Sequence, residues 1–242
     1  MRVRWLEQRL ENVRPGVDWL SDEEAAYLAG LHVLKRRDDW QLGRWTAKCA
    51  VAEMLGRSLD SAVLRNINVQ RTASGAPRVL LAGMPALFSI SLSHRAGRAA
   101  CVIAEQCVAL GCDLETIEPH SAAFVADYFT ASEQAMVASS DDRDRDTLVA
   151  LLWSAKESVM KVLRCGLNVD TRSIEIIRVG NSDAADSLRT PKSTWYSLEA
   201  RCSDKKVLTG WWSCDDGFVK TLICDNAITE ICPVELQSAS IF

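Results

Sequence analysis

The stretch GCDLE, at residues 111–115, carries two carboxylates at a spacing that could hold a cation. If the stretch ends a strand, Asp113 and Glu115 point to the same face, because side chains alternate along a strand. Two carboxylates on one face repel each other unless a cation lies between them. Oxygen ligands without His or Cys favour Mg²⁺ or Mn²⁺ over zinc. The alternative is an acidic strand end that faces solvent.

A second stretch, WSAKESVMK at residues 153–161, belongs to a helix that we expect at about 146–164. The buried stripe of this helix is predicted to consist of Leu148, Leu152, Ala155, Val159 and Val162. Glu157 and Lys161 fall on the opposite face, in the order that favours an exposed ion pair worth only about 0.3–0.5 kcal/mol. That pair is the structural interpretation. In the functional interpretation, Glu157 is a third carboxylate, and Lys156 and Lys161 bind phosphate.

The third stretch, SLSH at residues 91–94, places a hydroxyl beside an imidazole. Adjacent residues on a strand point to opposite faces, so Ser93 and His94 are poorly placed to act as nucleophile and base. The sequence contains no G-x-S-x-G elbow. Phosphate binding fits both side chains better, and the alternative is a histidine that is satisfied at a strand end.

Together the three stretches suggest a single site. Three acids can hold a hard cation that bridges a pyrophosphate. Lysines and arginines can neutralise the remaining phosphate charge. The sequence offers no obvious activated nucleophile of its own, so the inventory suits a phosphoryl-type transfer to an outside hydroxyl.

The elements that would position these residues follow the order helix then strands, twice. One helix begins with a capping-box pattern at Ser21 and Glu24, and a second is predicted at about 38–55. One face of the second helix would carry Arg37, Gln41, Arg44 and Lys48. Apolar and β-branched stretches predict strands at FSISLSH, AACVIA, CVALGCDLE, SIEIIRV, TWYSLEARC, LTGWWSC and FVKTLIC. The order predicts an α+β protein with two lobes side by side and a junction near residues 105–112.

The composition is typical of a soluble globular protein, with 242 residues, 48% hydrophobic and 25% charged, and a formal net charge of -4. The net charge gives no indication of nucleic acid or membrane as a partner. We expect a cytoplasmic protein, because no apolar run could span a membrane and the N-terminus lacks an apolar signal segment. The nine cysteines include no C-x-x-C pair and are expected to be reduced and mostly buried.

The three stretches in the order SLSH, GCDLE and WSAKESVMK resemble the 4'-phosphopantetheinyl transferases of the surfactin type. That family has the signatures S-H, G-[IV]-D-[IL]-E and W-[ST]-x-K-E-[SA]-x-x-K in the same order. The resemblance extends over about residues 30–230. It includes a G-x-P turn at Gly75 and Pro77 and an F-x-x-x-E segment at Phe129 and Glu133.

The resemblance implies a pseudo-dimer of two similar α+β lobes, at residues 1–108 and 109–242, with coenzyme A in the cleft between them. It implies a Mg²⁺-dependent transferase that moves the 4'-phosphopantetheine group of coenzyme A to a serine of an apo acyl or peptidyl carrier protein and releases 3',5'-ADP. Such proteins serve fatty-acid, polyketide, siderophore or nonribosomal peptide synthesis. A monomer is expected, because the second lobe supplies what a homodimer would otherwise bring.

The resemblance also assigns roles to residues. It implies that the metal ligands are Asp113, Glu115 and Glu157, and that the catalytic residues are Glu157, Lys161 and Asp113. Glu157 would act as the base, directly or through a metal-bound water. The implied coenzyme A contacts are Lys35, Arg36, Arg37, Arg44, Gly75, Pro77, Ser93, His94, Lys156 and Lys161. Of the basic cluster, Arg44 has the best match to the family pattern, and the others could form a solvated turn.

The sequence departs from the family pattern at two positions. Ala76 stands where the family often has lysine, which removes one phosphate or base contact. Cys112 stands at a position that is usually Ile or Val, and Cys can fill an apolar place.

Two other functions and one docking surface complete the expectations. A non-catalytic module could hold coenzyme A or a carrier protein, and a metal-dependent phosphohydrolase could use the same three acids. The segment 116–145, with Phe124, Tyr128 and Phe129, is a candidate carrier-docking surface. The alternative places these aromatic side chains in the core.

Overall fold

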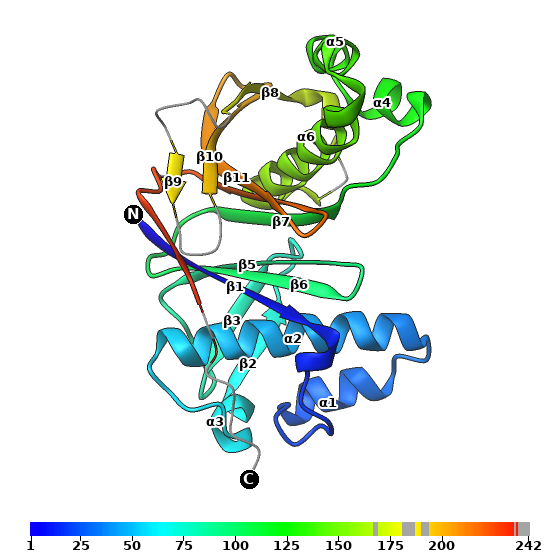
Figure 1. Cartoon of the computed structure of the whole chain (residues 1–242). Helices are drawn as coiled ribbons and strands as arrows, with labels where there is room; N and C mark the ends of the chain where they lie inside the picture. The colour runs from blue at the N-terminus through cyan, green and yellow to red at the C-terminus, as the bar shows by residue number, and fades with distance from the viewer. Residues whose placement is uncertain (167–168, 181–186, 190–193, 235, 237–242) are drawn as a thin grey trace.

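The fold is α+β, as expected, and consists of two lobes whose sheets pack against each other (Figure 1). The computed structural model describes residues 1–166, 169–180, 187–189, 194–234 and 236. Each lobe places one long helix on the outer face of its sheet. The layers therefore follow the order helix, sheet, sheet, helix.

The first lobe combines a sheet with a long helix and a second, smaller sheet. In chain order its elements are β1 (Arg2–Arg9), the 3-10 turn η1 (Leu10–Asn12), α1 (Asp22–Ala29), α2 (Leu34–Met54), α3 (Ser61–Arg65), β2 (Ile67–Arg71), β3 (Pro77–Leu81), β4 (Met84–Pro85), β5 (Ser89–Arg95) and β6 (Arg98–Ala104). Helix α2 packs on β1, β5 and β6, while β2, β3 and β4 form the smaller sheet.

The second lobe carries the longest helix of the described residues on a sheet with the order β7-β12-β11-β10-β8. Its elements are β7 (Leu110–Thr116), α4 (Ala122–Tyr128), α5 (Ala131–Ser139), α6 (Asp142–Leu163), the 3-10 turn η3 (Thr171–Ser173), β8 (Ile174–Val179), β9 (Ser187–Arg189), β10 (Thr194–Cys202), β11 (Val207–Asp215) and β12 (Phe218–Cys224). Helix α6 packs mainly on β7 and β12. A final strand, β13 (Glu230–Pro233), follows.

An apolar core lies between the two sheets. Trp5 of β1 meets Trp195 of β10 edge-on, with ring centroids 4.9 Å apart. Val102 of β6 and Cys112 of β7 are fully buried in the same cluster. Because each fully buried large apolar side chain stabilises the fold by about 1.5–3 kcal/mol, the lobes are joined by an interior rather than by a surface contact.

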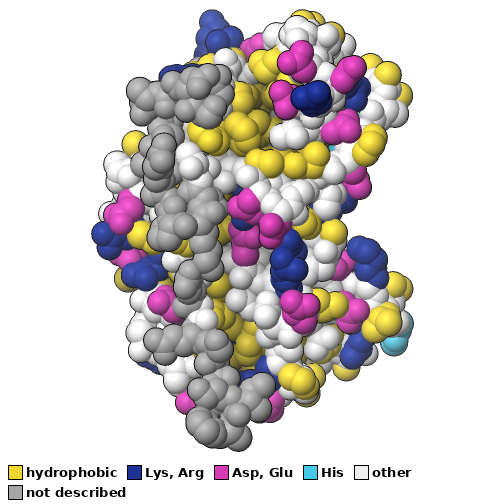
Figure 2. All heavy atoms as spheres, in the orientation of Figure 1, with side chains coloured by type: hydrophobic (Ala, Val, Ile, Leu, Met, Phe, Trp, Pro, Cys, Tyr) yellow, Lys and Arg dark blue, Asp and Glu magenta, His cyan; other side chains and the backbone are white. Residues whose placement is uncertain are grey.

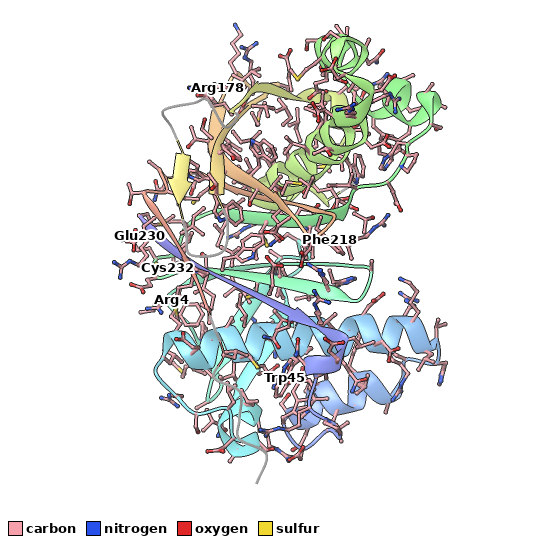
Figure 3. The ribbon with its side chains drawn as sticks, viewed as in Figure 1. Arg4, Trp45, Arg178, Phe218, Glu230 and Cys232 are labelled. Atoms are coloured by element: carbon pink, nitrogen blue, oxygen red, sulfur yellow. The ribbon has the colours of Figure 1, made fainter. Side chains whose placement is uncertain are left out.

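Strand β13 lies in the sheet of the first lobe, although it follows the second lobe in the chain. It pairs in parallel with β1, and Arg4 lies opposite Cys232. Figure 3 shows Arg4 beside Glu230 and Cys232 on these two strands. The division between residues 108 and 109 stays a prediction, and β13 pairs with the sheet of the first lobe.

The N-terminal residues form a strand, although the sequence predicted none before the first helix. Trp5 of β1 is covered by the second sheet, and Leu6 is covered on the opposite face by the first lobe's core. A strand that is buried on both faces lacks the simple alternation of apolar and polar residues by which strands are recognised. The charged residues between the buried ones concealed it further.

The predicted long helices and most of the predicted strands are confirmed, with shifted boundaries. Helix α2 begins at residue 34 rather than 38, and α6 begins at residue 142 rather than 146. The segment 56–88, for which the sequence predicted only a turn at Gly75 and Pro77, holds α3 and the small sheet, and 116–145 holds α4 and α5. These elements are too short to give a clear period in the sequence.

A buried ion pair ties together the helices of the first lobe. Ser21 caps α1 in the predicted capping box, and Glu24 of that box is only 4% exposed. Glu24 Oε2 lies 2.5 Å from Nζ of Lys48 on α2. Glu24 Oε1 accepts a hydrogen bond of 3.0 Å from the backbone N–H of Val69 on β2. Lys48, predicted on a basic helix face, is therefore fully buried.

The second lobe repeats this arrangement with different residues. Thr130 caps α5 in a capping box with Glu133, and Glu133 Oε2 lies 2.9 Å from Nζ of Lys156 on α6. Glu133 Oε1 accepts a hydrogen bond of 2.8 Å from the backbone N–H of Ile176 on β8. In both lobes the lysine also donates to two backbone carbonyls. The lobes are thus built on one plan, which a comparison of the two half-sequences did not reveal.

Gly111 allows β7 to approach α6 closely. A Cβ at this position would lie 2.0 Å from the carbonyl oxygen of Ser158. We expect Gly111→Ala to lower the free energy of unfolding by about 1–3 kcal/mol, because the strand must move away from the helix. Chemical denaturation followed by circular dichroism measures this change.

Gly43→Ala is the matched control for that substitution. Gly43 lies inside α2, and an added Cβ meets no atom within 4 Å. Alanine favours a helix over glycine by about 1 kcal/mol, so this variant should be as stable as the wild type or more stable. Equal losses in both variants would contradict the packing role of Gly111.

Candidate functional site

A cavity of about 710 Å³ lies between the two lobes. Its walls come from α2, the β2–β3 turn, β5, the β6–β7 loop and the C-terminal half of α6. The volume is within the range of about 300–1,000 Å³ that is usual for small-molecule sites. Two of the three predicted stretches, SLSH and WSAKESVMK, contribute residues to its lining.

Asp113 forms the buried centre of an acidic group beside the cavity. Its side chain is 2% exposed, and Oδ1 accepts hydrogen bonds from Ser93 Oγ at 2.7 Å and from Lys161 Nζ at 2.8 Å. Lys161 Nζ also donates to the carbonyl of Cys112 at 2.8 Å. Within the described residues, the buried Oδ2 has no hydrogen-bond partner. A buried carboxylate oxygen without a partner is costly, so Oδ2 is suited to a cation or a substrate group.

Burial and the charge of Asp113 raise the pKa values of two further carboxylates, those of Glu115 and Glu157. Burial, and then the charge of Asp113, raises the pKa of Glu115 to about 7, although Arg95 Nε lies 3.1 Å from Glu115 Oε2 and opposes the change. Burial, again followed by the charge of Asp113, raises the pKa of Glu157, which lines the cavity from α6. The acids therefore disfavour one another's charges, as the sequence predicted.

These acids suit a divalent cation in their chemistry but do not form a finished coordination shell. No group of three or more His, Cys, Asp or Glu side chains in the described part of the chain is arranged to hold a metal. Lys161 and Arg95 contact Asp113 and Glu115 and supply positive charge there. The unpartnered Oδ2 of Asp113 and the raised pKa values of its neighbours still fit an added cation.

Positive charge lines the cavity from both lobes. Six basic side chains contribute to its lining, namely Arg44, Arg71, Arg78, His94, Lys161 and Arg164. The sequence analysis did not identify Arg71, Arg78 and Arg164. Arg71 and Arg78 flank the predicted turn around Gly75, and their position beside this turn could have identified them as site residues. Arg164 caps α6 in the left-handed conformation, with φ of 55°, and nothing in the sequence indicated this.

The cavity brings together seven of the residues that the resemblance assigned to the site: Arg44, Gly75, Pro77, Ser93, His94, Glu157 and Lys161. Gly75 has φ of +83° in the β2–β3 turn, a conformation that favours glycine. Partial desolvation at the cavity wall lowers the pKa of His94, and the positive charges of Lys161 and Lys35 add to this effect. A neutral imidazole would therefore need a bound anion to favour its charged form.

The basic cluster at the start of α2 lies outside the cavity lining, and its contacts with coenzyme A stay a prediction. Lys35 is 85% exposed and pairs with Asp39 at 3.0 Å, at the rim of the cavity. Arg36 is exposed. Arg37 donates to two backbone carbonyls of the α1–α2 segment, at 2.9 and 3.1 Å. Lys35 and Arg36 are therefore exposed on the first turn of α2, whereas Arg37 is bound to the backbone.

Lys156 was expected to bind phosphate, and the structure corrects this assignment. The side chain is 0% exposed, pairs with Glu133 and does not line the cavity. Burial lowers its pKa, and the charge of Glu133 opposes the change. Successive helix residues point about 100° apart, so the neighbouring Glu157 faces the cavity while Lys156 faces the interior.

The aromatic residues of segment 116–145 pack mainly against α6. Phe129 is fully buried, and the ring of Phe124 lies 4.9 Å from Tyr128 and 5.3 Å from Trp153. Tyr128, at 40% exposed, reaches solvent. Most of the cluster therefore belongs to the core, and a docking role for this segment stays a prediction.

Residues 109–212 match the model of the 4'-phosphopantetheinyl transferase superfamily. This part of the chain belongs to that superfamily. The transferase segment contains GCDLE and WSAKESVMK, and it comprises most of the second lobe. The cations contributed by α2 and the β2–β3 turn lie before it. The subdivision into a surfactin type stays a prediction.

Two solved structures show a weaker similarity to the chain. The holo-[acyl-carrier-protein] synthase of Thermotoga maritima has 18% identity and a TM-score of 0.35, over 48% of this chain and 62% of that one. A holo-(acyl-carrier-protein) synthase of Bacillus anthracis, in complex with CoA (3',5'-ADP), has 20% identity and a TM-score of 0.34, over 42% of this chain and 91% of that one. The match therefore covers less than two thirds of the length of the Thermotoga maritima protein. No curated protein matched it.

On the face in Figure 2, acidic and basic side chains lie mixed, without a field of one sign. This face offers no extended basic surface for nucleic acid. Within the described residues, no helix has the length and apolar character needed to cross a bilayer.

Proposed function

We propose that this chain is a Mg²⁺-dependent 4'-phosphopantetheinyl transferase, which moves the 4'-phosphopantetheine group of coenzyme A to a serine of an apo acyl or peptidyl carrier protein. One observation carries the proposal: Glu157 and cations from both lobes line a single cavity between the lobes, and Asp113 is buried beside it against Lys161. A cation-lined cavity with an acidic end suits a ligand that carries several phosphates and needs a metal.

Coenzyme A would lie with its phosphates against the basic wall. Arg44 and His94, on the side of the first lobe, are the proposed contacts of the 3'-phosphate. Lys161, 30% exposed and close to the acids, is the proposed contact of the pyrophosphate. Arg71 and Arg78 add positive charge where Ala76 replaces the lysine that the family often has. The proposal therefore does not depend on the misassigned Lys156.

Asp113, Glu115 and Glu157 are the residues that would hold Mg²⁺, with Mn²⁺ as a chemical substitute. The ion, when bound, would neutralise charge on the pyrophosphate oxygens. The unpartnered Oδ2 of Asp113 is the first atom that it would satisfy. Lys161 and Arg95 would keep part of the acidic charge balanced before and after the ion binds.

The transfer exchanges one phosphorus–oxygen bond for another. Glu157 would accept the proton of the carrier serine, directly or through a bound water. The serine oxygen forms a bond to the β-phosphorus of coenzyme A. The bond from that phosphorus to the bridging oxygen breaks, and its electron pair leaves with 3',5'-ADP. Lys161 stabilises the charge that develops on the leaving group.

The test incubates the protein with coenzyme A, Mg²⁺ and a panel of apo carrier proteins, and follows the intact mass of each carrier. A mass increase equal to one phosphopantetheine group is the expected result. A binding module would hold coenzyme A without this increase. A phosphohydrolase would release 3',5'-ADP when no carrier is present. The panel also identifies the pathway, and sedimentation of the same sample tests the proposed monomer.

Lys161→Ala is expected to lower kcat by about 100-fold or more, because a positive charge is lost where negative charge develops. The affinity for coenzyme A, measured by calorimetry, should fall much less. Arg78→Gln is the comparison, since Arg78 lines the cavity from β3, away from the acids, and should change affinity more than kcat. Equal losses of kcat and affinity in Lys161→Ala would reassign Lys161 to ligand binding alone.

A further inference from the structure

Strands β5 and β7 meet along the floor of the cavity, where the two lobes join. β5 is the last strand of the first lobe's sheet, and β7 is the first strand of the second lobe's sheet. The two strands lie close together, and side chains connect them. Three serines at alternate positions of β5, Ser89, Ser91 and Ser93, face β7 and the segment that leads into it.

The three serines make different kinds of contact. Ser89 Oγ donates to the carbonyl of Val108 at 2.7 Å and accepts from the N–H of the same residue. Ser91 Oγ accepts from the backbone N–H of Cys112 at 2.9 Å. Ser93 differs from both, because its hydroxyl donates to the side chain of Asp113. Two serines thus bond backbone groups on β7 or just before it, and the third bonds a functional carboxylate.

The hydrogen bonds of Asp113 are divided unequally between its two oxygens. Ser93 and Lys161 both donate to Oδ1, while Oδ2 is buried without a partner among the described residues. Two donors from two different elements fix the rotation of the carboxylate. Oδ2 is thereby left as the oxygen that can bind a cation.

The Ser93 hydroxyl has a single proton to donate. That proton is committed to Asp113 at 2.7 Å. An ionised phosphate of coenzyme A offers only acceptor oxygens. The Ser93 hydroxyl therefore cannot donate to the phosphate while it donates to Asp113. The resemblance assigned Ser93 to coenzyme A, and the geometry assigns it to the carboxylate.

We propose that Ser93 is a positioning residue that orients Asp113 for Mg²⁺. The inference rests on the proposed function, because it concerns the same acids. Partners that orient a metal-binding side chain typically change metal affinity by about 10- to 100-fold when removed. Ser93 is 9% exposed, and it achieves this from the first lobe, across the lobe junction.

Calorimetry on Ser93→Ala tests the role without measuring turnover. Mg²⁺ is titrated into protein that is saturated with coenzyme A, and coenzyme A is titrated separately in the presence of a chelator. We expect the dissociation constant for Mg²⁺ to rise by about tenfold or more. The metal-free affinity for coenzyme A should change by less than about twofold, since no contact to it is lost. Ser93→Thr retains the hydroxyl and should restore Mg²⁺ binding.

Ser91→Ala is the matched control, because Ser91 lies on the same strand and is also buried. Its hydroxyl oxygen accepts from the backbone N–H of Cys112 and not from a functional side chain. This variant should lower thermal stability without weakening Mg²⁺ binding.

If Ser93→Ala does not fold, Ser93→Cys, with its weaker donor, replaces it. Equal Mg²⁺ affinities in the wild type and the Ser93 variants would overturn the role of Ser93. So would a loss of metal-free coenzyme A binding with unchanged Mg²⁺ affinity. A wild type that binds no Mg²⁺ would instead remove the proposed function as a whole.

Discussion

Replacing Asp113 by asparagine, or Glu157 by glutamine, is expected to lower the rate of phosphopantetheine transfer by at least about 1,000-fold. The asparagine would keep the size of the side chain and an acceptor for Ser93, but it would lose the charge that a cation needs. The glutamine would lose the proton acceptor, and removal of a general base alone typically costs about 10²–10⁴ in rate. Initial rates by intact mass of the carrier protein measure both effects.

Glu118→Gln is the control for these two substitutions. Glu118 also lies near Arg95, its side chain is 48% exposed, and it pairs with the guanidinium at 2.6 Å. Removing its charge should leave transfer within about threefold of the wild type, because exposed ion pairs contribute little. Near wild-type rates in Asp113→Asn or Glu157→Gln, with Mg²⁺ present, would show that the site has been assigned wrongly. Thermal unfolding of each variant separates lost chemistry from lost structure.

Removing Glu133 is expected to have the largest effect on stability. Glu133→Ala leaves the ammonium group of Lys156 fully buried without its carboxylate partner. Breaking a buried ion pair in this way typically costs about 3–5 kcal/mol. The same substitution also removes the capping-box contact to Thr130 and the acceptor of the Ile176 N–H. Urea denaturation at neutral pH measures the loss.

A double substitution distinguishes the buried charge from the packing around it. Lys156→Met in the Glu133→Ala background removes the uncompensated charge, so the double variant should be more stable than the Glu133→Ala single variant. A double variant whose loss equals the sum of the two single losses would show that the two residues do not act as a pair. Glu24→Ala and Lys48→Met repeat the experiment in the first lobe, where the same response is expected.

The repeated ion pair also shows why the chemistry is confined to one lobe. Counted from the hairpin turns that precede β6 and β12, Leu6 in β1 takes the place of Asp113 in β7. Cys49 follows Lys48 as Glu157 follows Lys156. The first lobe therefore keeps the structural pair but carries Leu6 and Cys49 where the second lobe carries Asp113 and Glu157. Its contribution to the cavity is positive charge instead.

The sequence by itself determined the parts that depend on local pattern. The buried stripe of α6 follows from the helical period, and β5, β6 and β7 follow from short runs of apolar and β-branched residues. The capping box at Ser21 and Glu24 formed as predicted, because all of its atoms lie within one helical turn. The charges of Asp113 and Glu157 were recognised in the same way, from residue type and spacing.

The tertiary structure decided which of these side chains share an environment. Lys156 and Lys161 look alike in the sequence, yet one is buried against Glu133 and the other reaches Asp113. The partner of each lysine comes from a distant segment, and only the packed fold brings the pair together. The same holds for Arg71 and for the hydrogen bond from Ser93 to Asp113. Burial and long-range pairing depend on the whole chain, whereas spacing in the sequence reports only on neighbours within a helix or strand.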